Sequence, residues 1–228
     1  MTDSTYSHVL FELSDKLENR LMYISPTLGG FTLKADVGGD DTASVGLGYS
    51  VTHGTVNLSA GVGYQVSGRA DGNSVSGGQA VQLKSGANQV LATGTSRDLA
   101  LSGSLYESGS GLFLTGEYSV AYADAASRQD ATNWFARAGW TKDVTRIGAT
   151  TVDAQYERTD NLLANGTSAH LWGVGIDQAL DAVASNVYLH YQHDSFDSTV
   201  TTTTKCDGAC TIAPQSIDSL TGGMIVRF

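Results

Sequence analysis

The sequence predicts an all-β protein, specifically a transmembrane antiparallel up-and-down β-barrel. Apolar and polar residues alternate with a period of two over most of the chain, as in strands whose successive side chains point to opposite faces. Short and long connections alternate between these segments, which is typical of barrels that span a membrane. The sequence has no run of roughly 18 consecutive apolar residues, so it offers no candidate transmembrane helix.

The last ten residues show the alternation most clearly. One parity of Ser219–Phe228 is apolar or small: Leu220, Gly222, Met224, Val226 and Phe228. An apolar terminal residue gains little in a soluble protein, because chain ends usually extend into water. In a transmembrane barrel an aromatic residue at that position lies at the membrane interface. We therefore expect this segment to be a strand whose apolar side chains face lipid.

About 11–12 segments are expected to be strands. Eleven have clear alternation: Asn19–Pro26, Phe31–Val37, Ala43–Val51, Val56–Gln65, Arg97–Tyr106, Gly111–Tyr122, Thr132–Thr141, Arg146–Arg158, Ser168–Gln178, Asn186–His193 and Ser219–Phe228. Val9–Leu13 is a weaker candidate for a twelfth. Aromatic residues on the apolar parity, such as Tyr64 and Trp134, lie near strand ends, as in interfacial girdles.

The connections between these segments fall into two classes. The short ones are Pro26–Gly30, Thr52–Gly54, Glu107–Ser110, Lys142–Val144 and Ala179–Ser185. The longer ones are Val66–Thr95, Tyr122–Ala131, Thr159–Thr167 and Asp194–Asp218, and Gly38–Asp41 is the short exception in this second class. Up-and-down pairing then places nearly all long loops at one end of the barrel and the tight turns at the other.

The second parity of the strands is small, polar or charged, which suits a water-filled lumen better than a packed core. Charges of both signs lie on this parity and are the candidate pore-lining residues: Arg20, Lys34, Arg137 and Arg227 against Asp36, Asp98, Glu117, Asp153 and Glu157. The simplest interpretation of most of them is a solvated wall in which the charges balance one another. Because carboxylates are more numerous, we expect a slight preference for cations, with Arg20, Lys34 and Arg137 forming the positive wall.

The overall charge and the first residues limit the function further. The formal net charge of −10 argues against a nucleic-acid-binding protein, which needs a basic face. The start, Met-Thr-Asp-Ser-Thr, lacks the basic and apolar regions of a signal peptide. A protein of the cell envelope needs one, so we expect that it was removed or that this chain is part of something longer.

Cys206 and Cys210 lie in a short Cys-Asp-Gly-Ala-Cys segment. A metal site needs more ligands than this segment supplies, so we expect no metal here. A small disulfide loop in an oxidising compartment fits better, and two free thiols in an extracellular loop are the alternative.

Two regions resemble the Gram-negative general porins, most closely the alphaproteobacterial type. Asn19–Phe31 is similar to the Asn-Arg-x-Arg-Tyr-x-Ser/Thr-Pro-x-x-x-Gly-Phe stretch of that family. Gly173–Asp181, Val187–Tyr191 and Gly222–Phe228 resemble its last three strands. The resemblance extends over about residues 12–228 and implies a homotrimeric pore in the bacterial outer membrane. It also implies that the barrel assembly machinery reads Phe228 as an assembly signal.

The family barrel has about sixteen strands, so the strands expected here correspond to its sixth to sixteenth. The resemblance thus implies a single porin-like domain, 1–228, in which residues 1–18 are a remnant of the constriction loop region and 19–228 form barrel strands. A fragment of that barrel is favoured over a complete smaller one, since single-chain bacterial barrels have even strand numbers. Met22 and Ile24 depart from the family pattern, which has a second basic residue and often Asp there, so ion selectivity does not carry over.

We expect passive diffusion of small hydrophilic solutes and ions, with no catalysis and no cofactor. A barrel-embedded hydrolase would need Ser, His and a carboxylate within reach of one another, and no nucleophile elbow accompanies His190, which is on the lumen parity. A non-conducting structural or adhesin-type barrel remains the alternative, although glycines and serines on the polar parity argue against a filled interior.

Overall fold

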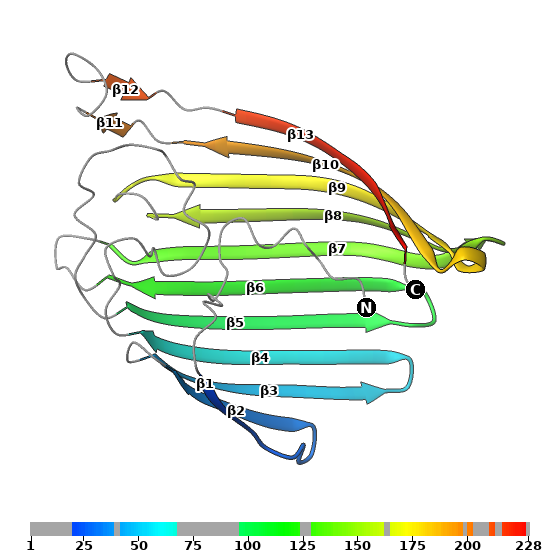
Figure 1. Cartoon of the computed structure of the whole chain (residues 1–228), viewed down its shortest axis with the longest axis horizontal. Coiled ribbons are helices and arrows are strands. Elements are labelled where there is room, and N and C mark those ends of the chain that lie inside the picture. The colour runs from blue at the N-terminus through cyan, green and yellow to red at the C-terminus, as the bar shows by residue number, and fades with distance from the viewer. Residues whose placement is uncertain are drawn as a thin grey trace.

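The computed structural model describes residues 20–38, 42–67, 96–123, 129–161, 165–197, 200–202, 210–212 and 216–226. Within these ranges the chain forms an 11-stranded sheet and a separate 2-stranded sheet (Figure 1). All pairings in both sheets are antiparallel. The expected all-β, up-and-down architecture is therefore confirmed.

The strands follow the predicted segments closely. The large sheet consists of β1 (Arg20–Ile24), β2 (Phe31–Gly38), β3 (Ala43–His53), β4 (Val56–Ser67), β5 (Ser96–Glu107), β6 (Leu112–Tyr122), β7 (Ala131–Thr145), β8 (Gly148–Asp160), β9 (Ser168–Leu180), β10 (Ser185–Phe196) and β13 (Ser216–Val226). The small sheet pairs β11 (Val200–Thr202) with β12 (Cys210–Ile212), and a short 3-10 helix, Asp181–Val183, follows β9.

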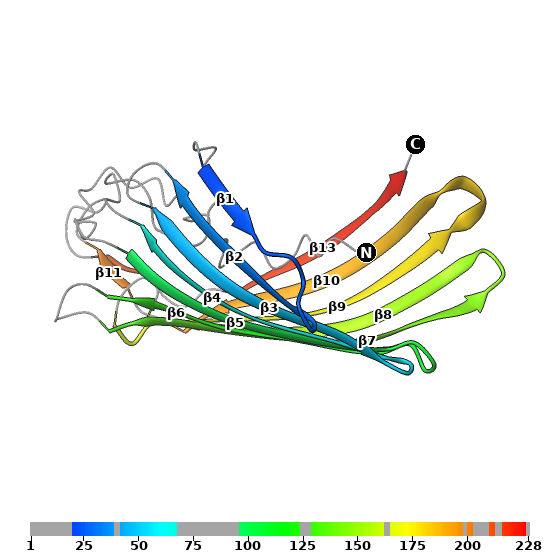
Figure 2. The ribbon, with the colours of Figure 1, turned by 90° about the horizontal axis from the view of Figure 1, so that it is seen from below.

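Each strand of the large sheet pairs with its neighbours in the sequence, except that β13 pairs with β10 past the small hairpin. The sheet is strongly curved, and its edge strands β1 and β13 rise on the same side (Figure 2). Within the described residues the sheet is not closed, because β1 and β13 each pair there with one strand only. The described chain thus forms a trough-shaped segment of barrel wall.

The strand ends joined by tight turns and the strand ends joined by longer connections lie at opposite ends of the sheet, as predicted (Figure 1). Most strand ends differ from the prediction by one to four residues. Lys142–Val144, expected to be a turn, continues β7, and a register shift between Lys142 and Thr145 precedes the actual turn at Arg146–Ile147. β8 accordingly begins at Gly148 and not at Arg146. β10 extends beyond His193 to Phe196, because its backbone keeps pairing with β9 and β13 after the alternation of side chains ends.

The two faces of the sheet differ sharply in composition. Cross-strand partners lie on one face, so the register separates an apolar set from a polar one. Residues of the apolar set are exposed, for example Leu114 at 54% and Ile176 at 46% of the whole residue. Residues of the polar set are often buried, as are Glu157 at 2% and Asp153 at 5%. Side chains on the concave side of a curved sheet converge and bury one another. We therefore call the polar face the inner face and the apolar face the outer face.

The core of this chain is unlike that of a soluble domain. Leu171 and Ala131 are the buried hydrophobic residues in the described part of the chain, whereas large apolar residues of the outer face are exposed on nearly every strand. Burying apolar surface is the main favourable term in folding, so an outer face of this kind needs an apolar surrounding. None of the helices in the described residues is long and apolar enough to cross a membrane.

Several predicted features lie outside the described residues. These are the expected constriction-loop remnant, residues 1–18, with the weak strand candidate Val9–Leu13, and also Cys206, Arg227 and Phe228. For Arg20 and Cys210 only the backbone is described.

Candidate functional site: the polar inner face

The register arranges the inner face in rows that cross the strands. One row runs from β6 to β10 and alternates carboxylates with apolar side chains: Glu117, Phe135, Glu157, Leu171 and Asp194. A second row, separated from the first by the row that contains Arg137 and Gln155, alternates large side chains with glycines: Phe113, Gly139, Asp153, Gly175 and His190. Each glycine leaves space that a side chain from an adjacent strand occupies. A Cβ on Gly139 would lie 2.7 Å from Cβ of Asp153, and one on Gly175 would lie 2.6 Å from Cε1 of His190.

Arg137 and Asp153 form the tightest charged contact on this face. Arg137 donates from Nε to Oδ1 of Asp153 at 3.0 Å and from Nη2 to Oδ2 at 2.8 Å. This two-pronged geometry is the strongest that Arg and a carboxylate form. The guanidinium also lies over the ring of Phe113, 5.7 Å from its centroid. Arg137 is therefore fixed against the wall.

Glu157 is held by a separate hydrogen-bond network that includes Asn133 and Thr159. Nδ2 of Asn133 donates to Oε1 of Glu157 at 2.9 Å, and Oγ1 of Thr159 contacts Oδ1 of Asn133 at 3.4 Å. All three side chains are buried. Buried polar groups are costly without partners, so this network explains how β7 and β8 tolerate an acidic residue at that depth.

The structure places the predicted pore-lining residues Lys34, Asp36, Asp98, Glu117, Arg137, Asp153 and Glu157 on the inner face, whereas the side chains of Arg20 and Arg227 are not described. It brings Arg137 and Asp153 into contact. Lys34 is exposed on β2, and Asp36 accepts a hydrogen bond from Oγ of Ser44 at 2.6 Å. The expected positive wall of Arg20, Lys34 and Arg137 stays a prediction, because the side chain of Arg20 is not described and Arg137 is paired with Asp153.

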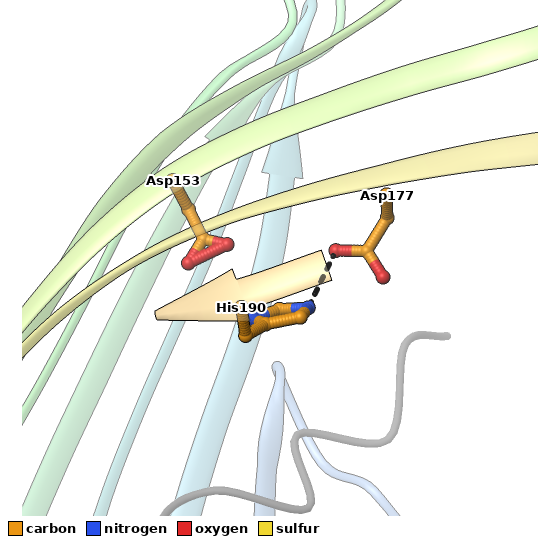
Figure 3. A group of neighbouring side chains, drawn as sticks. All are labelled: Asp153, Asp177 and His190. Carbon is orange, nitrogen blue, oxygen red and sulfur yellow. Dashed lines mark ion pairs between the residues drawn. The ribbon is translucent and has the colours of Figure 1, made fainter. Parts of the chain in front are cut away.

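Sequence reasoning missed two inner-face carboxylates and the neighbourhood of His190. Asp177 lies on the face of β9 opposite to Trp172, Val174 and Ile176, so the alternation along β9 already indicated that it belongs to the inner face. Asp194 lies beyond the predicted end of its strand. Nε2 of His190 lies 3.3 Å from Oδ2 of Asp177, and both residues lie close to Asp153 (Figure 3).

The outer face carries aromatic residues toward the ends of β7 to β10 that join the longer connections. Trp134 packs against Tyr156 with ring centroids 4.8 Å apart, and Trp172 packs against Tyr191 at 5.3 Å. Amphipathic rings in these positions suit the boundary between hydrocarbon and water. An apolar outer face bounded by aromatic residues, together with a polar inner face, defines a membrane β-barrel protein of the outer-membrane type.

Comparison with known proteins gives the family. Residues 2–199 match the family of Gram-negative porins. The chain therefore belongs to the Gram-negative porins and is a protein of the bacterial outer membrane. A comparison with curated protein sequences finds no match.

Solved structures show the same fold. The chain is similar to the anion-selective porin from Comamonas acidovorans, with a TM-score of 0.57 and 15% identity over 90% of this chain and 58% of that one. It is also similar to in-vitro folded OmpT, an outer membrane protein of Vibrio cholerae, with a TM-score of 0.52 and 13% identity over 90% of this chain and 61% of that one. The trimer form of that protein matches with a TM-score of 0.52, 13% identity and coverage of 90% and 62%. This chain thus spans less than two thirds of the length of each of these proteins.

Proposed function

We propose that this chain forms most of the wall of a water-filled channel through which small hydrophilic solutes and ions diffuse passively. The observation that carries the proposal is the polar inner face, where Arg137, Asp153 and Glu157 lie opposite an exposed apolar outer face. Membership of the porin family supports a channel, and we propose no catalysis and no cofactor. Oγ of Ser119 and Oδ1 of Asp36 are buried without a hydrogen-bond partner in the described protein, and channel water would satisfy both.

We propose further that the chain is part of a larger barrel. In the described part of the chain, no strand pairs with the outer edge of β1 or of β13, and backbone groups at such an edge cannot remain unpaired in hydrocarbon. The coverage of 58–62% of the three similar solved structures supports additional strands that join these edges. Residues 1–228 then belong to one porin-like domain, in which residues 1–18 correspond to the constriction loop region.

The charges of the inner face support a preference for cations. Among the described residues, carboxylates outnumber basic groups on this face, where Lys34 and Arg137 face Asp36, Asp98, Glu117, Asp153, Glu157, Asp177 and Asp194. A similar structure is that of an anion-selective porin, yet its identity with this chain is only 15%. Since charged linings select permeating ions, we propose the opposite preference for this chain.

The proposed partners follow from the family and from the outer face. We propose a homotrimer, which the trimer form of a similar outer membrane protein supports. We propose that outer-membrane lipids cover the remaining apolar outer face and that the outer-membrane barrel assembly machinery inserts the chain.

Conductance in a planar lipid bilayer tests the channel. We expect stable current steps that correspond to open channels. Under a KCl gradient, we expect a reversal potential whose sign indicates a preference for cations. Properly assembled protein that never conducts would support the alternative, a structural or adhesin-type barrel with a filled interior.

A further inference from the structure

Three potential metal ligands converge on the inner face where β8, β9 and β10 lie side by side (Figure 3). Asp153, Asp177 and His190 each offer one ligand atom, and these atoms all lie within 4.8 Å of one another. We propose that this group is a binding site for a divalent transition-metal ion, with Zn²⁺ as its representative. That the site lies in a channel rests on the proposed function, whereas the binding of the metal does not.

The donor atoms have the chemistry and the spacing that such an ion requires. Imidazole nitrogen and carboxylate oxygen are both ordinary zinc ligands, at about 2.0–2.2 Å from the metal in tetrahedral sites. Two ligands of one tetrahedral ion then lie roughly 3.3 Å apart. Nε2 of His190 and Oδ2 of Asp177 are 3.3 Å apart. The pair therefore already has the separation of two ligands of one ion, and an oxygen of Asp153 lies within 4.8 Å of both ligand atoms as the third.

Gly175 explains why His190 reaches this position. In the register Gly175 lies directly between Asp153 on β8 and His190 on β10. Since Gly175 has no side chain, the imidazole extends across β9 toward Asp153, and a Cβ at Gly175 would lie 2.6 Å from Cε1 of the ring. The three ligands thus come from three adjacent strands whose backbones are fixed by sheet hydrogen bonds, which is the preorganisation that a ligand site needs.

The charges of the site favour the binding of a cation with moderate affinity. With a neutral imidazole, the two carboxylates and the guanidinium of Arg137 leave one net negative charge. Arg137 holds both oxygens of Asp153, yet each carboxylate oxygen keeps a further lone pair for a metal. Arg137 therefore orients Asp153 while it lowers the affinity by repulsion.

Two other His–Asp pairs supply internal controls. On the outer face, Nε2 of His170 lies 2.8 Å from Asp197 and Nδ1 of His193 lies 2.7 Å from Asp218. Each of these pairs combines an imidazole with a carboxylate, the same two groups that His190 and Asp177 supply. The group at Asp153, Asp177 and His190 is the one set of three ligands found in the described part of the chain.

The test measures Zn²⁺ binding by calorimetry to the chain folded in detergent micelles. All proteins carry Cys206→Ser and Cys210→Ser, so that thiolates do not contribute. We expect one Zn²⁺ per chain, and a loss of affinity of more than about tenfold in His190→Ala and, independently, in Asp177→Asn. The matched control His193→Ala should bind as the parent does. Far-ultraviolet circular dichroism confirms that each variant is folded.

Two results would overturn the site: a folded parent that binds no stoichiometric Zn²⁺, and an equal loss of affinity in His193→Ala. Neither measurement depends on ion flux, so failure of the site and failure of the channel are distinguishable. In a conducting channel, bound Zn²⁺ adds positive charge to the wall. It should then lower cation conductance in the parent and in His193→Ala, but not in His190→Ala.

Discussion

Arg137 holds both carboxylate oxygens of Asp153, although the two residues are not direct cross-strand partners. Arg137 lies opposite Gln155, and Asp153 lies opposite Gly139, so the ion pair runs diagonally from β7 to β8. The side chain of Asp153 is 3% exposed and that of Arg137 is 15% exposed. At this burial, loss of one partner leaves a charge that water solvates poorly.

Arg137→Gln should therefore destabilise the folded protein, by up to about 3 kcal/mol, because Asp153 would remain buried without its partner. Urea unfolding in micelles, followed by tryptophan fluorescence, measures the change. The double variant Arg137→Gln/Asp153→Asn should recover part of the loss, since it buries no unpaired charge. Equal instability of the single and double variants would show that packing of Arg137 on Phe113, and not the ion pair, stabilises this region.

Gly139 should tolerate no side chain. A Cβ there would lie 2.6 Å from the carbonyl oxygen of Val152 and 2.7 Å from Cβ of Asp153, so Gly139→Ala must shift the backbone of β8. We expect a destabilisation of about 1–3 kcal/mol in the same unfolding assay. Gly63→Ala is the matched control on the same face, because the nearest atom to its Cβ, the carbonyl oxygen of Val45, is 4.0 Å away. The prediction is wrong if both alanines have the same effect.

The alternation of side chains made the strands and their two faces predictable from the sequence. Strand parity alone assigned Arg137 and Asp153 to the polar face, because a strand has only two faces to choose from. The contact between them was not predictable, since it depends on register. The tight turn at Arg146–Ile147 and the register shift after Lys142 set the register of β7 against β8, and the sequence placed that turn wrongly at Lys142–Val144.

The same limit explains the site around His190. The sequence assigned His190 to the polar parity, yet it gave no reason to bring Asp177 and Asp153 beside it. That neighbourhood arises because Gly175 lies between Asp153 and His190 in the sheet. Asp194 was missed for another reason: hydrogen bonds of the backbone extend β10 past the point where side-chain alternation ends.

Cys206 and Cys210 should form a disulfide in an extracellular loop. Cys210 lies on β12 opposite Thr202, in the hairpin between β10 and β13, at the end of the sheet with the longer connections (Figure 1). Non-reduced protein from the outer membrane should resist maleimide labelling, and reduction should expose two thiols per chain. Rapid labelling of both cysteines without reductant would contradict the disulfide.

Phe228 should act as an assembly signal. β13 continues the sheet to Val226 with Leu220, Met224 and Val226 exposed on the outer face, so an aromatic residue two positions further along would lie at the membrane interface. Deleting Phe228 should lower the amount of folded protein in the outer membrane, as measured by heat-modifiable migration of membrane fractions on gels. Replacement by Tyr, which keeps an aromatic ring, is the control and should assemble normally.

Lys34 and Glu117 should shift ion selectivity in opposite directions. Both lie on the inner face, Lys34 exposed on β2 and Glu117 half-buried on β6, so each adds its charge to the wall that permeating ions pass. Under a KCl gradient, Lys34→Gln should move the reversal potential further toward cation selectivity, because it removes a positive charge. Glu117→Gln should move it toward anion selectivity. Asp218→Asn, which removes a carboxylate from the outer face, should leave the potential unchanged. If Asp218→Asn shifts the potential as much as Glu117→Gln does, the two faces have been assigned the wrong way round; if neither inner-face variant shifts it, the inner face does not line the conducting path.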